Sequence, residues 1–333
     1  MGDGTAGGWP APRDMQANGV RLSVVDRGRG PLVLLYHGWP ELAFSWRHQF
    51  APLVDAGFRV LAPDLRGFGR SDAPADIAAY NVLDMVGDLV ALVAAAGEER
   101  AVVVGHDWGA NIAWAAALLR PDLFRAVAAL SVPFRARGPA PPLQSLRAAG
   151  QHGFYWLYFQ EPGVAEAEFE RDPAATIRRL LFWGSGDAPP GGRSEAGLLG
   201  VPPGGGFLDG MPDPAALPAW LDPAALDRHA AEYRRTGFRG GLNLYRNLDR
   251  NWALLAPWAG ARVSQPALFI AGTRDAVIRA PFGRAALEAM PAWVPNLRRT
   301  LLLEGAGHWI QQERPAEVTA ALLDFLRELP AGN

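Results

Sequence analysis

The sequence predicts an α/β fold in which helices flank a mostly parallel central sheet and a helical segment is inserted into the chain. Strand-like and helix-like segments alternate through the first 133 residues, which is typical of a doubly wound sheet. The alternation stops between residues 134 and 251 and resumes from residue 252 to the end. One large domain with an insertion fits the length of 333 residues and the hydrophobic content of 49%.

The segment before the insertion carries most of the strand signals. Residues 1–14 are rich in glycine and polar residues, and we expect them to form a flexible leader. Asn18-Gly19 predicts a hairpin turn between two strands. The continuously apolar run from Leu32 to Tyr36 indicates a buried strand. Further strands are expected at residues 59–62, 102–104 and 126–132, and helices at residues 45–54, 80–96 and 112–119.

The inserted segment, residues 134–251, shows helical patterns and many aromatic residues but no buried strand, so we expect a helical cap domain. Its Gly/Pro runs at residues 188–192 and 201–206 predict mobile loops. The core domain would then consist of residues 15–133 and 252–333. In its second part we expect strands at residues 267–271 and 299–303 and a closing helix at residues 316–329.

Composition excludes several classes of function. The net charge of −2 gives no electrostatic reason to expect a nucleic acid or an anionic membrane as partner. No segment approaches the roughly 20 apolar residues of a membrane span, and no signal-peptide pattern is present, so a cytoplasmic location is expected. The chain has no cysteine and no His/Asp/Glu cluster with metal spacing, so we expect no metal and no cofactor. All 32 basic residues are arginine, which indicates a GC-rich, bacterial genome.

The stretch from Val102 to Gly109 is the pattern of a nucleophile elbow, a sharp strand-to-helix turn that exposes one side chain. Gly105 and Gly109 provide the room that such a turn needs. The central position holds Asp107 where serine is usual. A carboxylate is ionised at neutral pH, so Asp107 can attack a strained or activated carbon without a base. The alternative interpretation is an aspartate that caps the following helix.

Two further residues complete the pattern of a catalytic triad. Asp275 and His308 each follow a predicted strand, at the edge where such sheets carry their sites. The chain order of nucleophile, acid and histidine is the order expected after such an elbow. A lone histidine is more often structural, but this position is the one expected of the third member. Glu304 is a second, weaker candidate for the acid.

These residues and several neighbouring motifs resemble epoxide hydrolases of the α/β-hydrolase superfamily, especially the soluble epoxide hydrolase group. The resemblance extends over nearly all of the chain after Gln16. It is carried by specific motifs: His37-Gly38-Trp39-Pro40, the elbow from Gly105 to Gly109, the segments at residues 154–166 and 237–247, and Gly307-His308-Trp309 with Pro315.

The resemblance implies the α/β-hydrolase fold with a cap domain, and a covalent mechanism. Asp107 would open an epoxide ring and become esterified. Tyr155 and Tyr245, which match the two acid tyrosines of the family, would polarise and protonate the ring oxygen. His308, oriented by Asp275, would activate the water that hydrolyses the ester. The product would be a vicinal diol.

The same resemblance assigns the residues that stabilise the ester hydrolysis. The backbone N–H groups of Trp39 and Trp108 are expected to form the oxyanion hole. His37, Gly38 and Pro40 are expected to support the loop that carries Trp39. The expected partner is a small apolar epoxide, with no nucleic acid or membrane partner, and the chain is expected to be a monomer or a homodimer.

Three alternatives stay open at this stage. A haloalkane dehalogenase uses the same aspartate, but it often has an asparagine where this chain has Trp39, and it does not need two phenols. A non-catalytic receptor or scaffold of the same fold would lack part of the site, whereas all members are present. Tyr155 and Tyr245 could also be ordinary packed aromatic residues. Trp39 and Trp156 depart from the family pattern and are expected to reshape the pocket.

Overall fold

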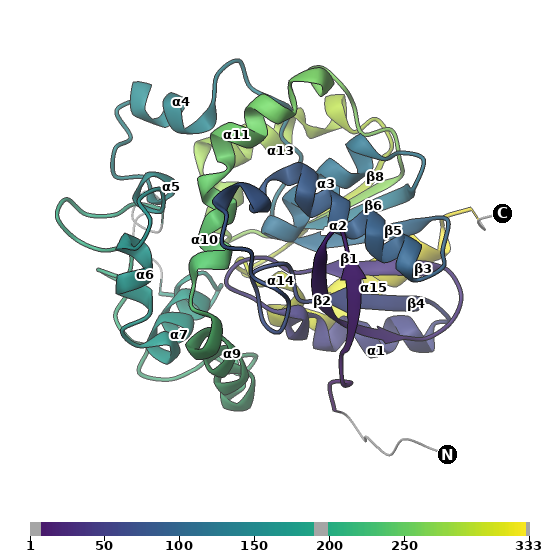
Figure 1. Ribbon diagram of the computed structural model, residues 1–333, viewed down its shortest axis with the longest axis horizontal. Coiled ribbons are helices and arrows are strands. Elements are labelled where there is room, and N and C mark those ends of the chain that lie inside the picture. Colours follow the sequence, from purple (N-terminus) through teal and green to yellow (C-terminus); the bar gives the residue numbers. More distant parts are fainter. Residues whose placement is uncertain (1–7, 190–198, 331–333) are drawn as a thin grey trace.

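A computed structural model describes residues 8–189 and 199–330 and contains one eight-stranded sheet (Figure 1). The strand order is β1-β2-β4-β3-β5-β6-β7-β8. Strands β4, β3, β5, β6, β7 and β8 run parallel to one another, and β2 pairs in the antiparallel sense with both β1 and β4. The bounds are β1 Arg13–Ala17, β2 Val20–Arg27, β3 Leu32–Tyr36, β4 Arg59–Pro63, β5 Ala101–His106, β6 Phe124–Leu130, β7 Ala267–Gly272 and β8 Leu297–Leu303. The predicted mostly parallel α/β sheet is confirmed.

The first hairpin forms as predicted. Ala17 pairs with Val20, so Asn18 and Gly19 make a two-residue turn between β1 and β2. Both turn residues have positive φ, 48° and 78°, which is the conformation of the turns that match strand twist. Strand β1 begins at Arg13, so the last two residues of the expected 1–14 leader belong to the sheet. Residues 1–7 lie outside the described residues.

Helices cover both faces of the sheet. The core helices and short helical turns are η1 Ala43–Trp46, α1 Arg47–Asp55, η2 Ile77–Tyr80, α2 Val82–Ala95, α3 Trp108–Leu119, η3 Ala256–Trp258, α12 Ala276–Arg279, α13 Pro281–Trp293, α14 Ile310–Glu313 and α15 Pro315–Arg327. On one face Leu34 and Val103 belong to the apolar cluster that includes the inner residues of α2 and α3. On the other face Val33 and Val102 pack in the cluster of α1 and α15. Successive strand residues point to opposite faces, so one continuously apolar run serves both layers.

Several strands differ from their predicted bounds by one or two residues, and two of these differences have a clear physical cause. Strand β6 ends at Leu130 rather than at residue 132, because Ser131 has a φ of 67° and leaves the extended conformation. Strand β8 begins at Leu297 rather than at residue 299. It is an edge strand whose burial pattern is mostly exposed or intermediate, so charged residues at its start are tolerated and give no strand signal.

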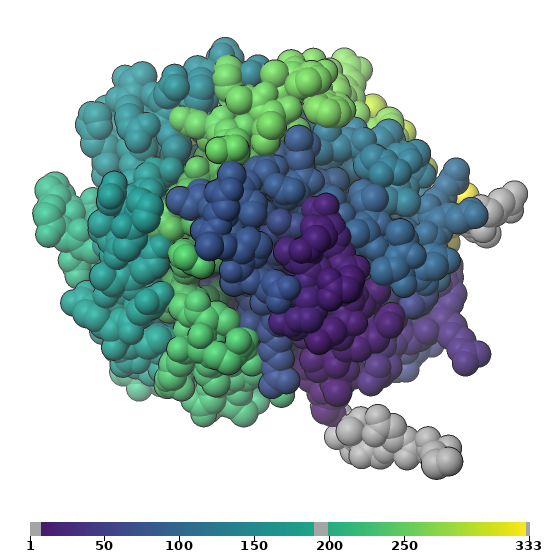
Figure 2. All heavy atoms as spheres, viewed as in Figure 1, coloured from purple at the N-terminus to yellow at the C-terminus, as the bar shows by residue number. Residues whose placement is uncertain are grey.

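Among the described residues, none of the sheet's strands lies between residues 131 and 266; only an isolated bridge joins Phe154 and Gly200. The segment contains α4 Pro142–Ala148, α5 Tyr155–Tyr158, α6 Val164–Phe169, α7 Pro173–Trp183, α9 Pro223–Thr236, α10 Arg239–Arg246 and α11 Leu248–Leu254. These helices lie beside the sheet in Figure 1, and in Figure 2 the teal and green segments pack directly against blue segments of the core. We infer the predicted division into a core and a cap of residues 134–251 from this arrangement, although α11 runs across the expected boundary at residue 251.

Of the two Gly/Pro runs of the cap, one is described fully by the structure and the other only in part. Residues 201–206 form irregular structure with a turn closed by the Gly205 N–H and the Pro202 carbonyl. Most of the other run, residues 190–192, lies outside the described residues. Within the described part of the chain, no helix combines the length and the apolar character needed to cross a membrane.

Candidate active site

Asp107 lies in a sharp turn between β5 and α3, as the elbow pattern predicts. Its φ of 54° and ψ of −117° are strained for a residue with a side chain, at a cost of about 1–3 kcal/mol. A Cβ atom at Gly105 would lie 2.1 Å from the carbonyl oxygen of Gly109, and one at Gly109 would lie 2.0 Å from that of Tyr36. Only glycine fits at both positions. The Asp107 side chain makes no capping hydrogen bond to the helix, so the interpretation as a helix cap is wrong.

The loop after β3 brings a backbone donor to this carboxylate. The Trp39 N–H donates to Asp107 Oδ1 over 2.8 Å. A Cβ atom at Gly38 would lie 2.4 Å from Asp107 Oδ1, so glycine is required for this approach. His37 Nε2 accepts a hydrogen bond from the Leu65 N–H, and Nδ1 faces the Gly38 carbonyl oxygen. Burial lowers the pKa of His37 to about 4, so this ring is neutral and holds the loop. The Trp39–Pro40 peptide bond is cis.

His308 lies between two carboxylates. Its Nε2 is 3.3 Å from Asp107 Oδ2 and its Nδ1 is 2.9 Å from Asp275 Oδ2. The other oxygen of Asp275 accepts a hydrogen bond from the Val277 N–H, which fixes the carboxylate. Glu304, the second candidate acid, is an exposed residue. The structure therefore brings Asp107, His308 and Asp275 together in the predicted order.

These charges shift the pKa of His308. Burial alone would lower the pKa of its imidazole, but Asp275 and Asp107 outweigh burial and raise it well above 6.5. The free protein at neutral pH therefore holds an imidazolium between two carboxylates. Esterification of Asp107 would remove one negative charge, so the pKa of His308 would then fall toward a value suited to a base.

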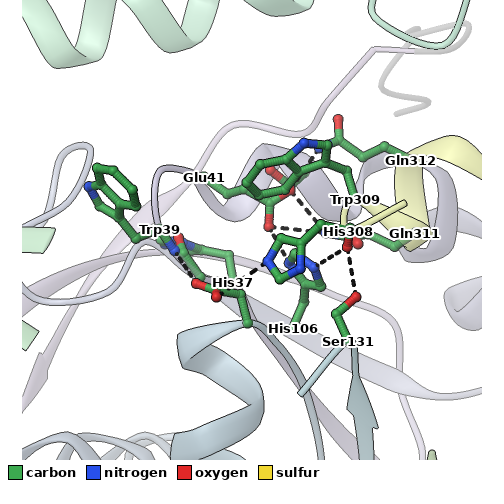
Figure 3. Close-up of polar contacts among 12 residues, drawn as sticks. His37, Trp39, Glu41, His106, Ser131, His308, Trp309, Gln311 and Gln312 are labelled. Carbon is green, nitrogen blue, oxygen red and sulfur yellow. Dashed lines mark hydrogen bonds and ion pairs between the residues drawn. The ribbon is translucent and has the colours of Figure 1, made fainter. Parts of the chain in front are cut away.

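A second buried histidine supports the loop of His308 (Figure 3). The carbonyl oxygen of His308 faces His106 Nε2 at 2.8 Å and accepts a hydrogen bond from Ser131 Oγ at 2.7 Å. His106 Nδ1 lies 2.6 Å from Glu41 Oε2. The Glu41 carboxylate also accepts hydrogen bonds from the side-chain amides of Gln311 and Gln312.

The protonation of this pair follows from its partners. A carbonyl oxygen can only accept, so His106 Nε2 carries a proton. Burial would raise the pKa of Glu41, but His106 outweighs burial and lowers it to about 2. Glu41 is therefore ionised beside the ring of His106. The sequence analysis missed this pair, since Glu41 and His106 are far apart in the chain and no spacing pattern links them.

Tyr155 on α5 and Tyr245 on α10 pack edge to face against each other, and both line the cavity that Asp107 also lines. Their ring centroids are 5.6 Å apart. Tyr245 also packs edge-on against Trp108 at 5.0 Å and Trp39 at 5.8 Å. Burial raises the pKa of both phenols, and the charge of Asp107 raises them further. Both are therefore protonated donors at neutral pH. The ring contacts fix the positions of the two hydroxyl groups.

The cavity between the core and the cap helices has a volume of about 590 Å³ and is mostly apolar. Asp107, Tyr155 and Tyr245 line it together with Trp108. Its size suits a small organic molecule. Among the described residues, no group of three or more histidine, aspartate or glutamate side chains could hold a metal ion.

The elbow, the loop of Trp39 and the histidine between two carboxylates define a hydrolase site of the α/β-hydrolase type with an aspartate at the nucleophile position. The family model described as the alpha/beta hydrolase fold matches residues 31–315. Epoxide hydrolase A of Mycobacterium tuberculosis is 51% identical over 97% of this chain and 99% of its own. An epoxide hydrolase of Caballeronia sordidicola is 41% identical over 96% of this chain and 94% of its own.

Solved structures agree with the sequence relatives. Epoxide hydrolase A of Mycobacterium thermoresistibile has a TM-score of 0.91 at 49% identity and covers 97% of this chain and 100% of that one. Potato epoxide hydrolase I has a TM-score of 0.87 at 38% identity and covers 96% and 99%. The chain belongs to the epoxide hydrolases of the α/β-hydrolase family. The resemblance read from the motifs is confirmed.

Proposed function

We propose that this chain hydrolyses an apolar epoxide to a vicinal diol through a covalent ester on Asp107. The single observation that carries the proposal is the position of the Asp107 carboxylate. One oxygen accepts the Trp39 N–H and the other lies 3.3 Å from His308 Nε2, while both phenols line the same cavity. An epoxide bound beside Asp107 would therefore have the nucleophile, the phenols as acids and His308 as base within one pocket.

The first step is ring opening. Asp107 Oδ2 forms a bond to one epoxide carbon, and the bond between that carbon and the ring oxygen breaks. The leaving alkoxide is strongly basic, so it takes a proton from the phenol of Tyr155 or Tyr245, with the other phenol donating a hydrogen bond. Asp107 Oδ1, held by the Trp39 N–H, becomes the carbonyl oxygen of the ester.

The second step is ester hydrolysis. Once Asp107 is esterified, His308 loses its proton and the phenolate left by ring opening regains one, with solvent carrying the proton between them. His308 Nε2 then takes a proton from a water whose oxygen attacks the carbonyl carbon of Asp107. The negative charge then develops on Oδ1, where the backbone N–H groups of Trp39 and Trp108 would stabilise it. The bond between the carbonyl carbon and Oδ2 breaks, and the diol oxygen takes the proton from His308. Asp275 stabilises the imidazolium that forms in between.

A comparison of products tests this function directly. The protein is incubated with styrene oxide and, in parallel, with a panel of chloroalkanes. We expect release of phenylethanediol and no release of chloride. Chloride release without diol would favour the dehalogenase alternative. If neither diol nor chloride forms, the result would favour a non-catalytic role.

A cytoplasmic location and a monomeric or homodimeric state are further proposals. Cell fractionation tests the first, and size-exclusion chromatography with light scattering tests the second.

A further inference from the structure

A segment of the cap packs against the backbone of the loop that carries His308. This docking segment, residues 184–188, follows α7, and the histidine loop, residues 304–309, joins β8 to α14. A Cβ atom at Gly186 would lie 2.1 Å from the carbonyl oxygen of Gly305, so only glycine permits this approach. Both stretches are described in full, and neither contributes a residue to the cavity that the substrate would occupy. The contact therefore joins the cap to the proposed base at a place separate from the substrate.

Glu313 on α14 connects the two stretches through three backbone donors. Its Oε2 accepts the Gly186 N–H over 2.8 Å and the Gly307 N–H over 2.7 Å, and its Oε1 accepts the Trp309 N–H over 2.9 Å. The side chain is buried, with 6% of the residue exposed. Gly307 and Trp309 flank His308 in the chain. One buried carboxylate therefore holds the backbone on both sides of the proposed base and, in addition, one residue of the cap.

The backbone of His308 also bonds directly to the docking segment. Its N–H donates to the carbonyl oxygen of Gly184 over 2.8 Å. On the other side, its carbonyl oxygen accepts a hydrogen bond from Ser131 Oγ and faces His106 Nε2 (Figure 3). The docking segment thus supplies one hydrogen bond to His308 and one to Glu313. Displacement of the segment would therefore loosen both the base and the carboxylate that holds its loop.

Arg274 fixes the docking segment from the side of Asp275. Its guanidinium donates to the carbonyl oxygens of Gly186 and Ala188. Arg274 directly precedes Asp275 in the chain, so the segment is bonded beside two residues of the triad. Gly186 is held on both sides by charged groups, since Glu313 accepts its N–H and Arg274 donates to its carbonyl oxygen. Hydrogen bonds with one charged partner are among the stronger ones, so the position of the segment is well defined.

We propose that Glu313 is a positioning residue for ester hydrolysis, which holds His308 in place for its role as base and makes that role depend on the docked cap segment. Glu313 touches no reacting atom and acts through the backbone around His308. Hydrolysis needs His308 Nε2 aligned with the water and the ester, and a misplacement of about 1 Å can cost about 10²-fold in rate. Ring opening uses Asp107 and the phenols, which lie outside the hydrogen bonds of Glu313. The inference rests on the proposed function.

The test separates the two steps on the full chain. Excess protein is mixed with styrene oxide and quenched at intervals, and intact mass spectrometry follows how fast the alkylated protein forms and decays. Glu313→Gln keeps the size of the side chain but replaces one acceptor oxygen by a donor that faces a backbone N–H. We expect ester decay to slow by roughly 10- to 100-fold while ester formation stays within about twofold of the wild type. Equal slowing of both steps, or normal decay, would overturn the proposal.

Glu168→Gln is the matched control. Glu168 is a cap residue of similar burial, 7% exposed, and its carboxylate also accepts two backbone N–H groups, those of Phe207 and Leu208. The variant makes the same chemical change in a similar environment, so ester decay should keep its wild-type rate. Slowed decay in this control would mean that any buried carboxylate has the same effect, and would overturn the specific role of Glu313.

Gly186→Ala tests the cap side of the contact. It disturbs the docking segment and leaves the Glu313 carboxylate in place, so it should also slow ester decay more than ester formation. Near-ultraviolet circular dichroism checks the fold of each variant, and Gly186→Ala decides the proposal if Glu313→Gln does not fold. Normal ester decay in folded Gly186→Ala would overturn the dependence of the base on the cap.

Proton NMR separates failure of this inference from failure of the proposed function. The free protein holds the His308 imidazolium between two carboxylates, so its ring N–H protons should resonate far downfield. We expect Glu313→Gln to shift or broaden these resonances and Glu168→Gln to leave them unchanged. If the wild type forms no ester, the proposed function is wrong and the resonances alone decide: a shift in Glu313→Gln keeps Glu313 as a positioning residue, and unchanged resonances reject it.

Discussion

The two sides of the cavity are held by different interactions. The core side, with Asp107, His308 and Asp275, is fixed by hydrogen bonds between charged groups and backbone donors at distances of 2.8 to 3.3 Å. The cap side, with Tyr155 and Tyr245, is fixed mainly by aromatic packing at centroid distances of 5.0 to 5.8 Å. Hydrogen bonds of charged groups are directional and strong, whereas ring contacts tolerate small movements.

In the proposed mechanism, this difference divides the chemistry between a nucleophile held by hydrogen bonds and acids held by ring packing. Covalent attack needs one geometry, and the core side is built around a strained turn and glycines. Protonation of the ring oxygen would be shared by the two phenols on the cap helices. Removing a core group should therefore be costly, and removing one phenol should be milder.

The largest effect is expected for Asp107→Ala. Without the carboxylate no ester forms, so turnover should fall by at least about 10⁴-fold. Steady-state diol formation measures the loss, and near-ultraviolet circular dichroism checks the fold. A folded variant that keeps a tenth of the wild-type rate would contradict the role of Asp107.

The next effect is expected for His308→Gln. Ring opening does not need a base, whereas ester hydrolysis does, so the alkylated protein should accumulate. Intact mass spectrometry after mixing with styrene oxide should show the protein mass raised by one substrate. Unmodified protein together with normal turnover would contradict the role of His308 in ester hydrolysis.

A smaller effect is expected for the single variants Tyr155→Phe and Tyr245→Phe. Each should slow ring opening by about 10²-fold, because one phenol remains to donate. Stopped-flow fluorescence measures the step, since Trp108 packs against Tyr245. The double variant should lose far more than either single one. If neither single variant changes the rate, the assignment of the acids is wrong.

Glu41→Gln tests whether the buried pair of Glu41 and His106 stabilises the core side of the cavity. Removing one partner of the buried pair with His106 should lower the free energy of unfolding by about 3 kcal/mol, with a modest change in rate. Urea unfolding gives the value. Asp122→Asn is a suitable control, since its pair with Arg120 is exposed and should contribute little. Equal stability of the two variants would contradict a contribution of the Glu41–His106 pair to the free energy of unfolding.

The smallest effect is a pH dependence of stability. The folded pKa of His308 is raised above 6.5 by Asp275 and Asp107. Its contribution to stability is therefore fully present below pH 6.5 and is lost as pH rises through the raised folded value. The difference in unfolding free energy between wild type and His308→Gln should shrink over that interval. A difference that grows with pH would contradict the ion pair.

The two sides also differ in how far the sequence predicts them. Asp107, Asp275 and His308 follow strands whose apolar runs are visible in the sequence, and parallel strands end at one edge of the sheet. Their meeting could therefore be predicted from the residues alone. Tyr155 and Tyr245 lie on short cap helices whose packing no local pattern determines, so they were found only through the resemblance to a family.

The Glu41–His106 pair could not be predicted from the sequence. It depends on a tertiary contact between segments far apart in the chain, and a glutamate after a proline is not a distinctive pattern. The shift of the β6 end had a local cause, the φ of 67° at Ser131, which the apolar sequence around it does not reveal.

A single turnover in oxygen-18 water tests the central claim most directly. Excess protein is mixed with styrene oxide, and the diol and the peptide that contains Asp107 are analysed by mass spectrometry. The ester route predicts that the label enters the Asp107 carboxylate and that the diol formed in this first turnover carries none. Label in the diol with none in the peptide would mean that water attacks the epoxide itself, and the covalent account would be wrong.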